Sequence, residues 1–461
     1  MKKKASNSQK PQVLHRFTDI YVAGMLSVFL LYPGTAGYAN ITAHKAALFF
    51  LLSGIYGLGV PLLRLGLTAG GAAAAPKPKA IWRKMGLGEK LLLGYWVMTA
   101  ISTALSRFPG AAFWGGARRE GFVTISLYCL CCLWVSRYGQ AKRWMLWLFA
   151  AAMCVNDALA IWQLAGGNPL GLYPDGMNYY DGFKLYAGQF LGTIGNVDLL
   201  SALLTVAIPV FWVAMLKMKG RRRFLLAVPL GMSLGVLFTA FVSGGVLGVT
   251  LGAVLTVPVV AKRGKGRRIL AAGAGAMLLL AVPVVYFGGS YMGGFLAEAA
   301  QIMRGQVEDS FGSGRIYIWR KSLELAKELP LFGGGPETMV YRSDAVFERF
   351  DPELNVTIRS YVDTAHNEYL NVLVNQGIFA MTAFVGTIAA ALVRWVKRAP
   401  DSVITASCGA AVLAYAVQAL FGISSLVSAP FFYLALGFLL GDTGCVQSKA
   451  TEEISAEKQG R

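Results

Sequence analysis

One histidine stands where it could accept a proton. His366 lies in DTAHNEYLNVLVNQGIFAM, residues 363–381, where Asp363 or Thr364 can cap a long apolar helix and place the imidazole in its first turn. The positive end of a helix disfavours the imidazolium, so we expect a neutral ring able to accept a proton. A lone histidine is usually structural, and the residues alone leave that alternative open.

A basic amphipathic segment precedes this histidine. SGRIYIWRKSLELAKELP, residues 313–330, has apolar side chains at helical spacing, with Ser313 as the expected N-cap and Pro330 as the stop. Arg315 falls near its start, and we expect the helix to lie against the membrane surface or the helix bundle. LFGGGP follows at 331–336, where three glycines allow either a helix-ending turn or backbone amides offered to an anion.

The composition indicates that these segments belong to a membrane protein. Of 461 residues, 55% are hydrophobic and only 15% are charged, and such a chain needs lipid to cover its apolar surface. The net charge of +19 sits in short clusters between apolar runs, so we expect membrane lipids and no nucleic acid as partners. The basic start runs into an apolar stretch without a small-residue cleavage site, and we expect it to stay as an anchor.

About twenty mainly apolar residues are needed to cross the hydrocarbon layer. Twelve runs qualify or nearly do, which predicts an all-α polytopic protein of about 12 transmembrane helices. They fall near 17–34, 44–64, 89–106, 121–137, 143–165, 197–216, 224–241, 245–261, 269–287, 368–396, 402–422 and 426–442.

Lysine and arginine gather on every second connection, which predicts the orientation. On the expected cytoplasmic side lie the N-terminal tail and the clusters within 64–84, 137–143, 217–223, 262–268 and 394–398. We therefore expect a cytoplasmic tail at 1–16, nine spans over 17–287, a large, partly helical external loop at 288–365, three spans over 366–442 and a cytoplasmic tail at 443–461. The loop mixes charges of both signs with aromatic residues and is the expected place of the chemistry.

The order of motifs in this region resembles the O-antigen ligase and O-antigen polymerase superfamily. The family pattern has an Arg with a Trp four residues on, a P-L-x-G-x-G-P turn, and a His-Asn pair opening a span. Its elements stand here as Arg315, Trp319, the turn 330–336, and His366 with Asn367. Two weaker similarities are AFWGGARREGF at 112–122 and GTIGNVDLLSALLTVAIP at 192–209, which contains the Gly-Asn motif with Asn196.

The resemblance implies a function and a fold. Members of the family transfer a glycan from an undecaprenyl diphosphate carrier to an acceptor hydroxyl, on a glycan, lipid or protein, at the outer face of the cytoplasmic membrane. They are similar to glycosyltransferases of the C-type fold and work without a metal or another cofactor. We therefore expect a bacterial inner-membrane enzyme with both termini in the cytoplasm.

The diphosphate leaving group calls for cations in the site, and arginine binds phosphate oxygens in pairs. Arg118 and Arg119 lie on the expected outer side, against the positive-inside trend, although a solvated charge pair is the alternative interpretation. Our hypothesis is that Arg315 with Arg118 or Arg119 grips the diphosphate. His366 would orient or deprotonate the acceptor hydroxyl, and attack opposite the diphosphate would invert the anomeric centre.

Two family positions differ here. Gln189, Phe190 and Leu191 stand where many members have an arginine before the Gly-Asn motif, and Ser243, Gly244 and Gly245 replace a Ser-Arg-Gly motif. Either the external arginines, Lys184 or Arg320 substitute in donor binding, or the donor is bound differently. Glu368 could orient the imidazole, bind sugar or cap the helix.

Two other classes remain in competition. A membrane transporter or lipid-linked oligosaccharide flippase fits twelve spans, but a duplicated transporter usually has its long connection in the middle of the chain and inside. A peptidoglycan-type polymerase of the shape, elongation and division family also has a large external loop. Such an enzyme would need a catalytic aspartate there, for which the chain offers Asp309, Asp344, Asp351 and Asp363.

Overall fold

The computed structural model describes residues 2–69, 78–181, 188–351 and 356–441, and about 75% of the structure is helical. Each of the twelve apolar runs forms a helix. Their bounds are α1 Lys2–Gly24, continued by a π-helical turn at Met25–Phe29, α2 Ile41–Ala69, α4 Leu87–Ala104, α6 Phe122–Tyr138, α7 Arg143–Leu164, α8 Val197–Lys217, α9 Ala227–Ala240, α10 Ser243–Val260, α11 Lys265–Met292, α14 Glu368–Arg398, α15 Val403–Gln418 and α16 Ala429–Leu440.

The connections between these helices contain further helices and turns. They are α3 Pro78–Lys84, α5 Pro109–Trp114, α12 Gly294–Met303, α13 Phe311–Glu328 and the 3-10 turns at Gly37–Asn40, Arg221–Leu226, Met339–Tyr341 and Ala399–Asp401. Two small antiparallel hairpins qualify the all-α prediction: β1 Phe190–Leu191 pairs with β2 Gly195–Asn196, and β3 Val346–Asp351 pairs with β4 Val356–Tyr361.

Seven helical stretches in the described part of the chain are long and apolar enough to cross a membrane. They are Gly37–Ala69, Arg143–Leu164, Val197–Lys217, Arg221–Ala240, Ser243–Val260, Lys265–Met292 and Glu368–Asp401. Three shorter apolar helices, α6, α15 and α16, pack inside the bundle. The fold is thus that of a mainly helical membrane protein, and the count of twelve crossings stays a proposal.

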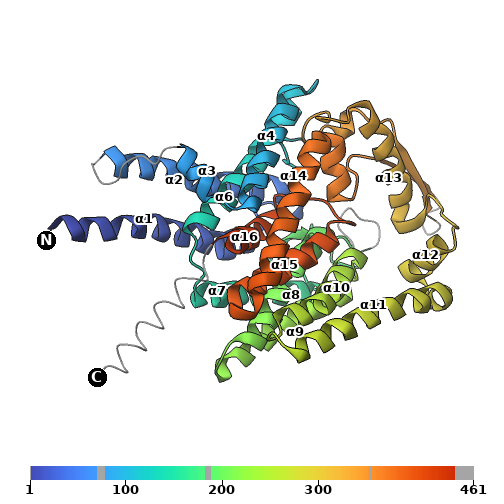
Figure 1. The fold of residues 1–461 in the computed structure, drawn as a ribbon. Coiled ribbons are helices and arrows are strands. Elements are labelled where there is room, and N and C mark those ends of the chain that lie inside the picture. The colour runs from blue at the N-terminus through green and yellow to red at the C-terminus, as the bar shows by residue number, and fades with distance from the viewer. Residues whose placement is uncertain (1, 70–77, 182–187, 352–355, 442–461) are drawn as a thin grey trace.

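The centre of the bundle is formed by α8, α15 and α16, which contact one another and are the most completely buried. In contrast, α11 lies along one edge, and none of its most apolar stretch is buried (Figure 1). An apolar helix with exposed sides is stable where lipid surrounds it. The N-terminus and the segment with α12 and α13 lie at opposite ends of the bundle in Figure 1.

The predicted amphipathic helix is α13. It begins at Phe311 with Ser310 at the cap position, while the expected cap, the side chain of Ser313, lies outside the described residues. Its apolar face packs on the N-terminal part of α14 through a small separate core, in which Ile318 and Leu325 meet Val374. The helix therefore lies on the bundle.

The glycine turn after α13 fits into a break in α14. Gly377 has φ +83° inside α14, so the helix is interrupted there. The amide of Ile378 donates to the carbonyl of Pro330 (2.9 Å), and the amide of Gly335 donates to that of Asn375 (2.7 Å). A Cβ at Gly333 would lie 2.4 Å from the backbone of Asn375, so only glycine permits this approach. The turn interpretation of LFGGGP holds, because its amides bond to protein carbonyls.

Candidate active site

One carboxylate from a distant part of the chain binds the backbone of the loop between α5 and α6. Glu337, just after the glycine turn, accepts hydrogen bonds from the backbone N–H groups of Arg118 and Glu120, both at 2.7 Å. Arg119 between them has φ +59°, and its carbonyl accepts a hydrogen bond from the Thr124 hydroxyl. This tight turn sends the Arg118 side chain inward and leaves Arg119 exposed.

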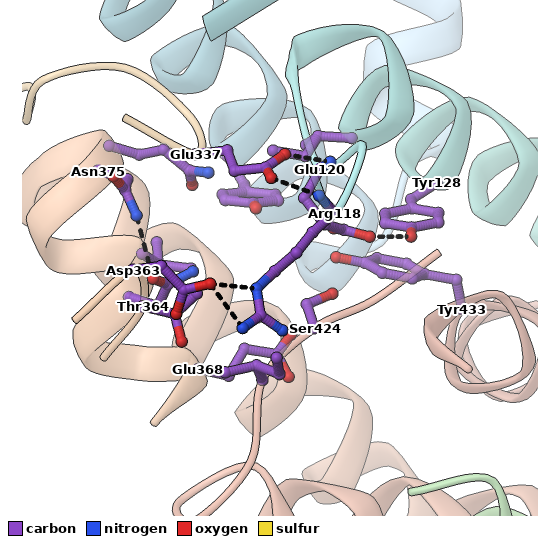
Figure 2. A pocket seen from close by; sticks show the side chains of 16 residues that line it. Arg118, Glu120, Tyr128, Glu337, Asp363, Thr364, Glu368, Asn375, Ser424 and Tyr433 are labelled. Atoms are coloured by element: carbon purple, nitrogen blue, oxygen red, sulfur yellow. Dashed lines mark hydrogen bonds and ion pairs between the residues drawn. The ribbon is translucent and has the colours of Figure 1, made fainter. Parts of the chain in front are cut away.

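Arg118 forms an ion pair with Asp363, which lies shortly before α14 (Figure 2). Its Nε and Nη2 donate to Asp363 Oδ2 at 3.2 and 2.8 Å. The two side chains are 29% and 41% exposed, so the pair is open to solvent and to a ligand. Asp363 therefore positions Arg118 and does not cap the helix as the sequence had suggested.

Beside this pair is a pocket with an empty volume of about 570 Å³, which includes the open space at its mouth. It is lined by side chains from five separate parts of the chain, several of them polar. Those drawn and labelled in Figure 2 are Arg118, Glu120, Tyr128, Glu337, Asp363, Thr364, Glu368, Asn375, Ser424 and Tyr433. Within the described residues, no three His, Cys, Asp or Glu side chains are grouped so as to hold a metal ion.

Glu120 and Glu368 bring two carboxyl groups to this pocket. The Tyr128 hydroxyl donates to Glu120 Oε1 at 2.7 Å, and the Tyr415 hydroxyl donates to Glu368 Oε2 at 3.2 Å. Burial raises the pKa of Glu120 to about 8, and the nearby Glu337 and Glu368 charges add to that rise. Glu120 can thus hold or release a proton near neutral pH.

His366 stands next to this pocket, one residue before the helix cap. The structure corrects the expected cap: Asn367 accepts a hydrogen bond from the Leu370 amide, and α14 begins at Glu368. His366 therefore precedes the first turn, with φ +45°. The pKa of its ring is lowered by burial and by the positive charges of Arg118 and Arg315. The direction of this shift agrees with the expected neutral imidazole, and its main causes are burial and two guanidinium groups.

Arg315 lies close enough to His366 for its positive charge to lower the pKa of the ring. Its Nη1 donates to the carbonyl of Gly312 at 2.8 Å, while its Nε is buried without a partner in the structure. A buried N–H with no acceptor is costly, and an anion bound beside His366 would supply one. The structure thus brings Arg118, Arg315 and His366 within electrostatic range of one another.

The other predicted ligand residues lie elsewhere. Arg320 is exposed and forms an ion pair with Asp309, and it does not line the pocket. Asn196 caps α8 by accepting hydrogen bonds from the amides of Asp198 and Leu199. Lys184 lies outside the described residues. Among these predictions, Arg118 and Glu368 reach the pocket, Asn367 serves as a cap beside it, and Arg119, Arg320 and Asn196 do not line it.

The pocket residues that the sequence analysis missed include Glu120, Glu337 and Asn375. Glu120 lies inside the stretch 112–122 and Glu337 directly follows the turn 330–336, but acidic side chains were not sought there. Asn375 shows no sequence signal; its side-chain oxygen accepts from the Thr338 amide at 3.2 Å, and its Nδ2 donates to Asn371 Oδ1 at 3.1 Å.

A family model described as O-antigen ligase matches residues 228–385, which include Arg315, Glu337, Asp363 and His366. Comparison with curated proteins gives no match. The family match confirms the resemblance to O-antigen ligases for this part of the chain. Together with the apolar helices it indicates a bacterial membrane protein with an O-antigen ligase or polymerase type of function in polysaccharide biosynthesis.

Proposed function

We propose that this protein transfers a glycan from an undecaprenyl diphosphate carrier to an acceptor hydroxyl at the outer face of the cytoplasmic membrane. The observation that carries the proposal is the convergence of two guanidinium groups, from Arg118 and Arg315, on one neutral imidazole, His366. Twelve crossings would place both termini in the cytoplasm and residues 288–365 outside. The opposite placement of the N-terminus and α13 in Figure 1 supports this arrangement.

The two arginines would hold the diphosphate. Arg118 uses two of its five N–H groups on Asp363, so three remain for phosphate oxygens. Arg315 has a buried Nε without a partner in the structure, and its charge acts on His366. As the bond between the sugar and the phosphate breaks, negative charge grows on the phosphate oxygen, and fixed cations stabilise that charge.

His366 would take the proton. The acceptor oxygen attacks the anomeric carbon, its O–H proton passes to the neutral imidazole, and the bonding electrons of the C–O bond leave with the diphosphate. Attack from the side opposite the leaving group inverts the anomeric centre. A lowered pKa keeps the ring unprotonated at neutral pH, as a general base requires.

The carboxyl groups of the pocket would bind the sugar. Glu120 and Glu368 face the same cavity and can accept hydrogen bonds from glycan hydroxyls.

We propose that the transfer is metal-independent, because guanidinium groups can neutralise the diphosphate charge that a metal ion would otherwise neutralise. A chelator should leave the rate unchanged, and activity that is lost with chelator and restored by a divalent cation would contradict this part.

The proposal is tested by replacing the groups at its centre. Membranes containing the Arg315→Ala or the His366→Ala variant are compared with wild type for transfer from a lipid-linked oligosaccharide, at matched protein levels. Arg320→Ala is the matched control, because Arg320 is on the same helix but exposed and paired with Asp309. We expect both test variants to lose transfer by about 100-fold or more while the control retains it. Unchanged transfer in both test variants would refute the assignment.

A further inference from the structure

The end of α14 far from the candidate active site borders a second, strongly basic pocket. The helix has 31 residues, so its ends lie roughly 45 Å apart. Near its last turns Arg394 and Arg398 line a pocket of about 1310 Å³, counting open space. The other basic side chains that line it are His15, Lys84, Arg137 and Lys142.

The acidic groups near this pocket are already occupied. Glu89 accepts hydrogen bonds from the Ser136 hydroxyl and the Gly86 amide, both at 2.8 Å. Asp19 forms an ion pair with Lys142. Since Glu89 is the one carboxylate among the described lining residues, the pocket carries a net positive charge and suits an anionic group with several oxygens.

An apolar cavity adjoins the basic pocket. It has an empty volume of about 730 Å³ and lies between α1, α7, α8, α15 and α16. Ala141 and Lys142 line both spaces, so the two share a wall. Leu146, Val210 and Ile404 are only partly buried, which indicates that the cavity reaches the side of the bundle.

The lining of this cavity is apolar apart from Lys142, Ser407 and Cys408. A ligand that fits both spaces must combine an anionic head with a hydrocarbon chain.

We propose that these two adjoining spaces form a binding site for one anionic lipid. Its phosphate lies in the basic pocket beside Arg137, and one hydrocarbon chain enters the apolar cavity. Free phosphate or diphosphate would satisfy the basic pocket alone, whereas a lipid uses both spaces. The site is separate from the candidate active site, and the proposal does not depend on glycan transfer.

The test measures lipid retained by the purified full-length protein. Protein in detergent is incubated with phosphatidylglycerol or with phosphatidylcholine, and bound lipid is counted by native mass spectrometry. Arg137→Glu reverses a charge in the basic pocket, and Ala435→Trp fills the apolar cavity. Arg222→Glu is the matched control, because this exposed arginine makes the same charge change outside both spaces. Thermal unfolding verifies that each variant is folded.

We expect wild type to retain one phosphatidylglycerol and to prefer it over phosphatidylcholine. Arg137→Glu and Ala435→Trp should each lower its retention by about tenfold or more, and the control should not. Equal retention of both lipids, or wild-type retention by both variants, would overturn the proposal. In a separate arm inorganic diphosphate is added. If it displaces the lipid fully and Ala435→Trp has no effect, the site binds a free anion and the lipid assignment fails.

Discussion

Arg118 donates from Nε and Nη2 to one and the same carboxylate oxygen of Asp363, at 3.2 and 2.8 Å. The two residues are 245 positions apart in the chain, and their pairing joins the loop before α6 to the segment before α14. The pair uses two of the five N–H groups of Arg118, so three stay available. The pair therefore orients a guanidinium that can still bind a phosphate.

Arg118 and its neighbour provide a direct comparison. Arg118→Gln should lower glycan transfer by about 100-fold, because the developing phosphate charge loses a fixed cation. Arg119→Gln removes the same charge from an exposed side chain and should leave the rate within about twofold of wild type. Initial rates at saturating donor check both. Equal losses in the two variants would show that general surface charge matters and the ion pair with Asp363 does not.

The acid limb of the pH profile of glycan transfer should reflect the protonation of His366. Burial and the charges of Arg118 and Arg315 lower its pKa below the ordinary 6.5, so wild-type transfer should fall only at lower pH, where the ring becomes protonated. Arg118→Gln removes one of these positive charges, so the limb of its residual activity should move to higher pH. Profiles of both proteins and of Arg119→Gln provide the measurement. A limb that stays in place or moves to lower pH contradicts the assigned base.

Sequence patterns revealed the helices more fully than the site. Each of the twelve hydrophobic runs forms a helix, because a segment surrounded by lipid must bury its backbone polar groups in a helix. The cap of α14 was misplaced, since Asp363, Thr364 and Asn367 are all capable of capping. Choosing among them required knowing that Asp363 is engaged by Arg118.

The pocket itself could not be predicted from the sequence. Glu120 and Glu337 each look like ordinary loop carboxylates, and only the packing of α6 on α16 and of α16 on α14 brings them together with Glu368. The break in α14 at Gly377 was equally hidden, because one glycine in an apolar run is common in membrane helices.

Glu120 should give the protein a characteristic pH dependence of stability. Its pKa is raised from 4.5 to about 8 in the folded state, so its stabilising contribution is complete below pH 4.5 and is lost as the pH rises through 8. The Tm of Glu120→Gln minus that of wild type should therefore grow between pH 5 and about 8 and then level off. Thermal unfolding in detergent at several pH values provides the measurement.

Glu324→Gln is the control for this prediction. Glu324 is exposed, and its hydrogen bond with Lys321 lowers its pKa, so the carboxyl group stays ionised from pH 5 to 8. The corresponding Tm difference should stay flat over this range. A flat difference for Glu120→Gln as well would show that Glu120 is ionised throughout.

The glycine turn packs so closely against α14 that adding one methyl group at Gly377 should lower the free energy of unfolding. At Gly377 a Cβ would lie 2.2 Å from the carbonyl oxygen of Leu331, and φ is +83°. Gly377→Ala should lower the free energy of unfolding by about 1–3 kcal/mol. Gly231→Ala, in α9 with open space around its Cβ, should be neutral or stabilising by up to about 1 kcal/mol. Similar Tm values for the two variants would contradict the proposed close approach.

The most direct measurement follows the lipid diphosphate itself. Purified protein in proteoliposomes is given a lipid-linked oligosaccharide and an acceptor glycan, and free undecaprenyl diphosphate and elongated acceptor are quantified together. The account predicts that both appear in equal amounts with wild type and that neither forms with His366→Ala. A donor that stays intact and only moves between the two leaflets would identify a flippase and contradict the account.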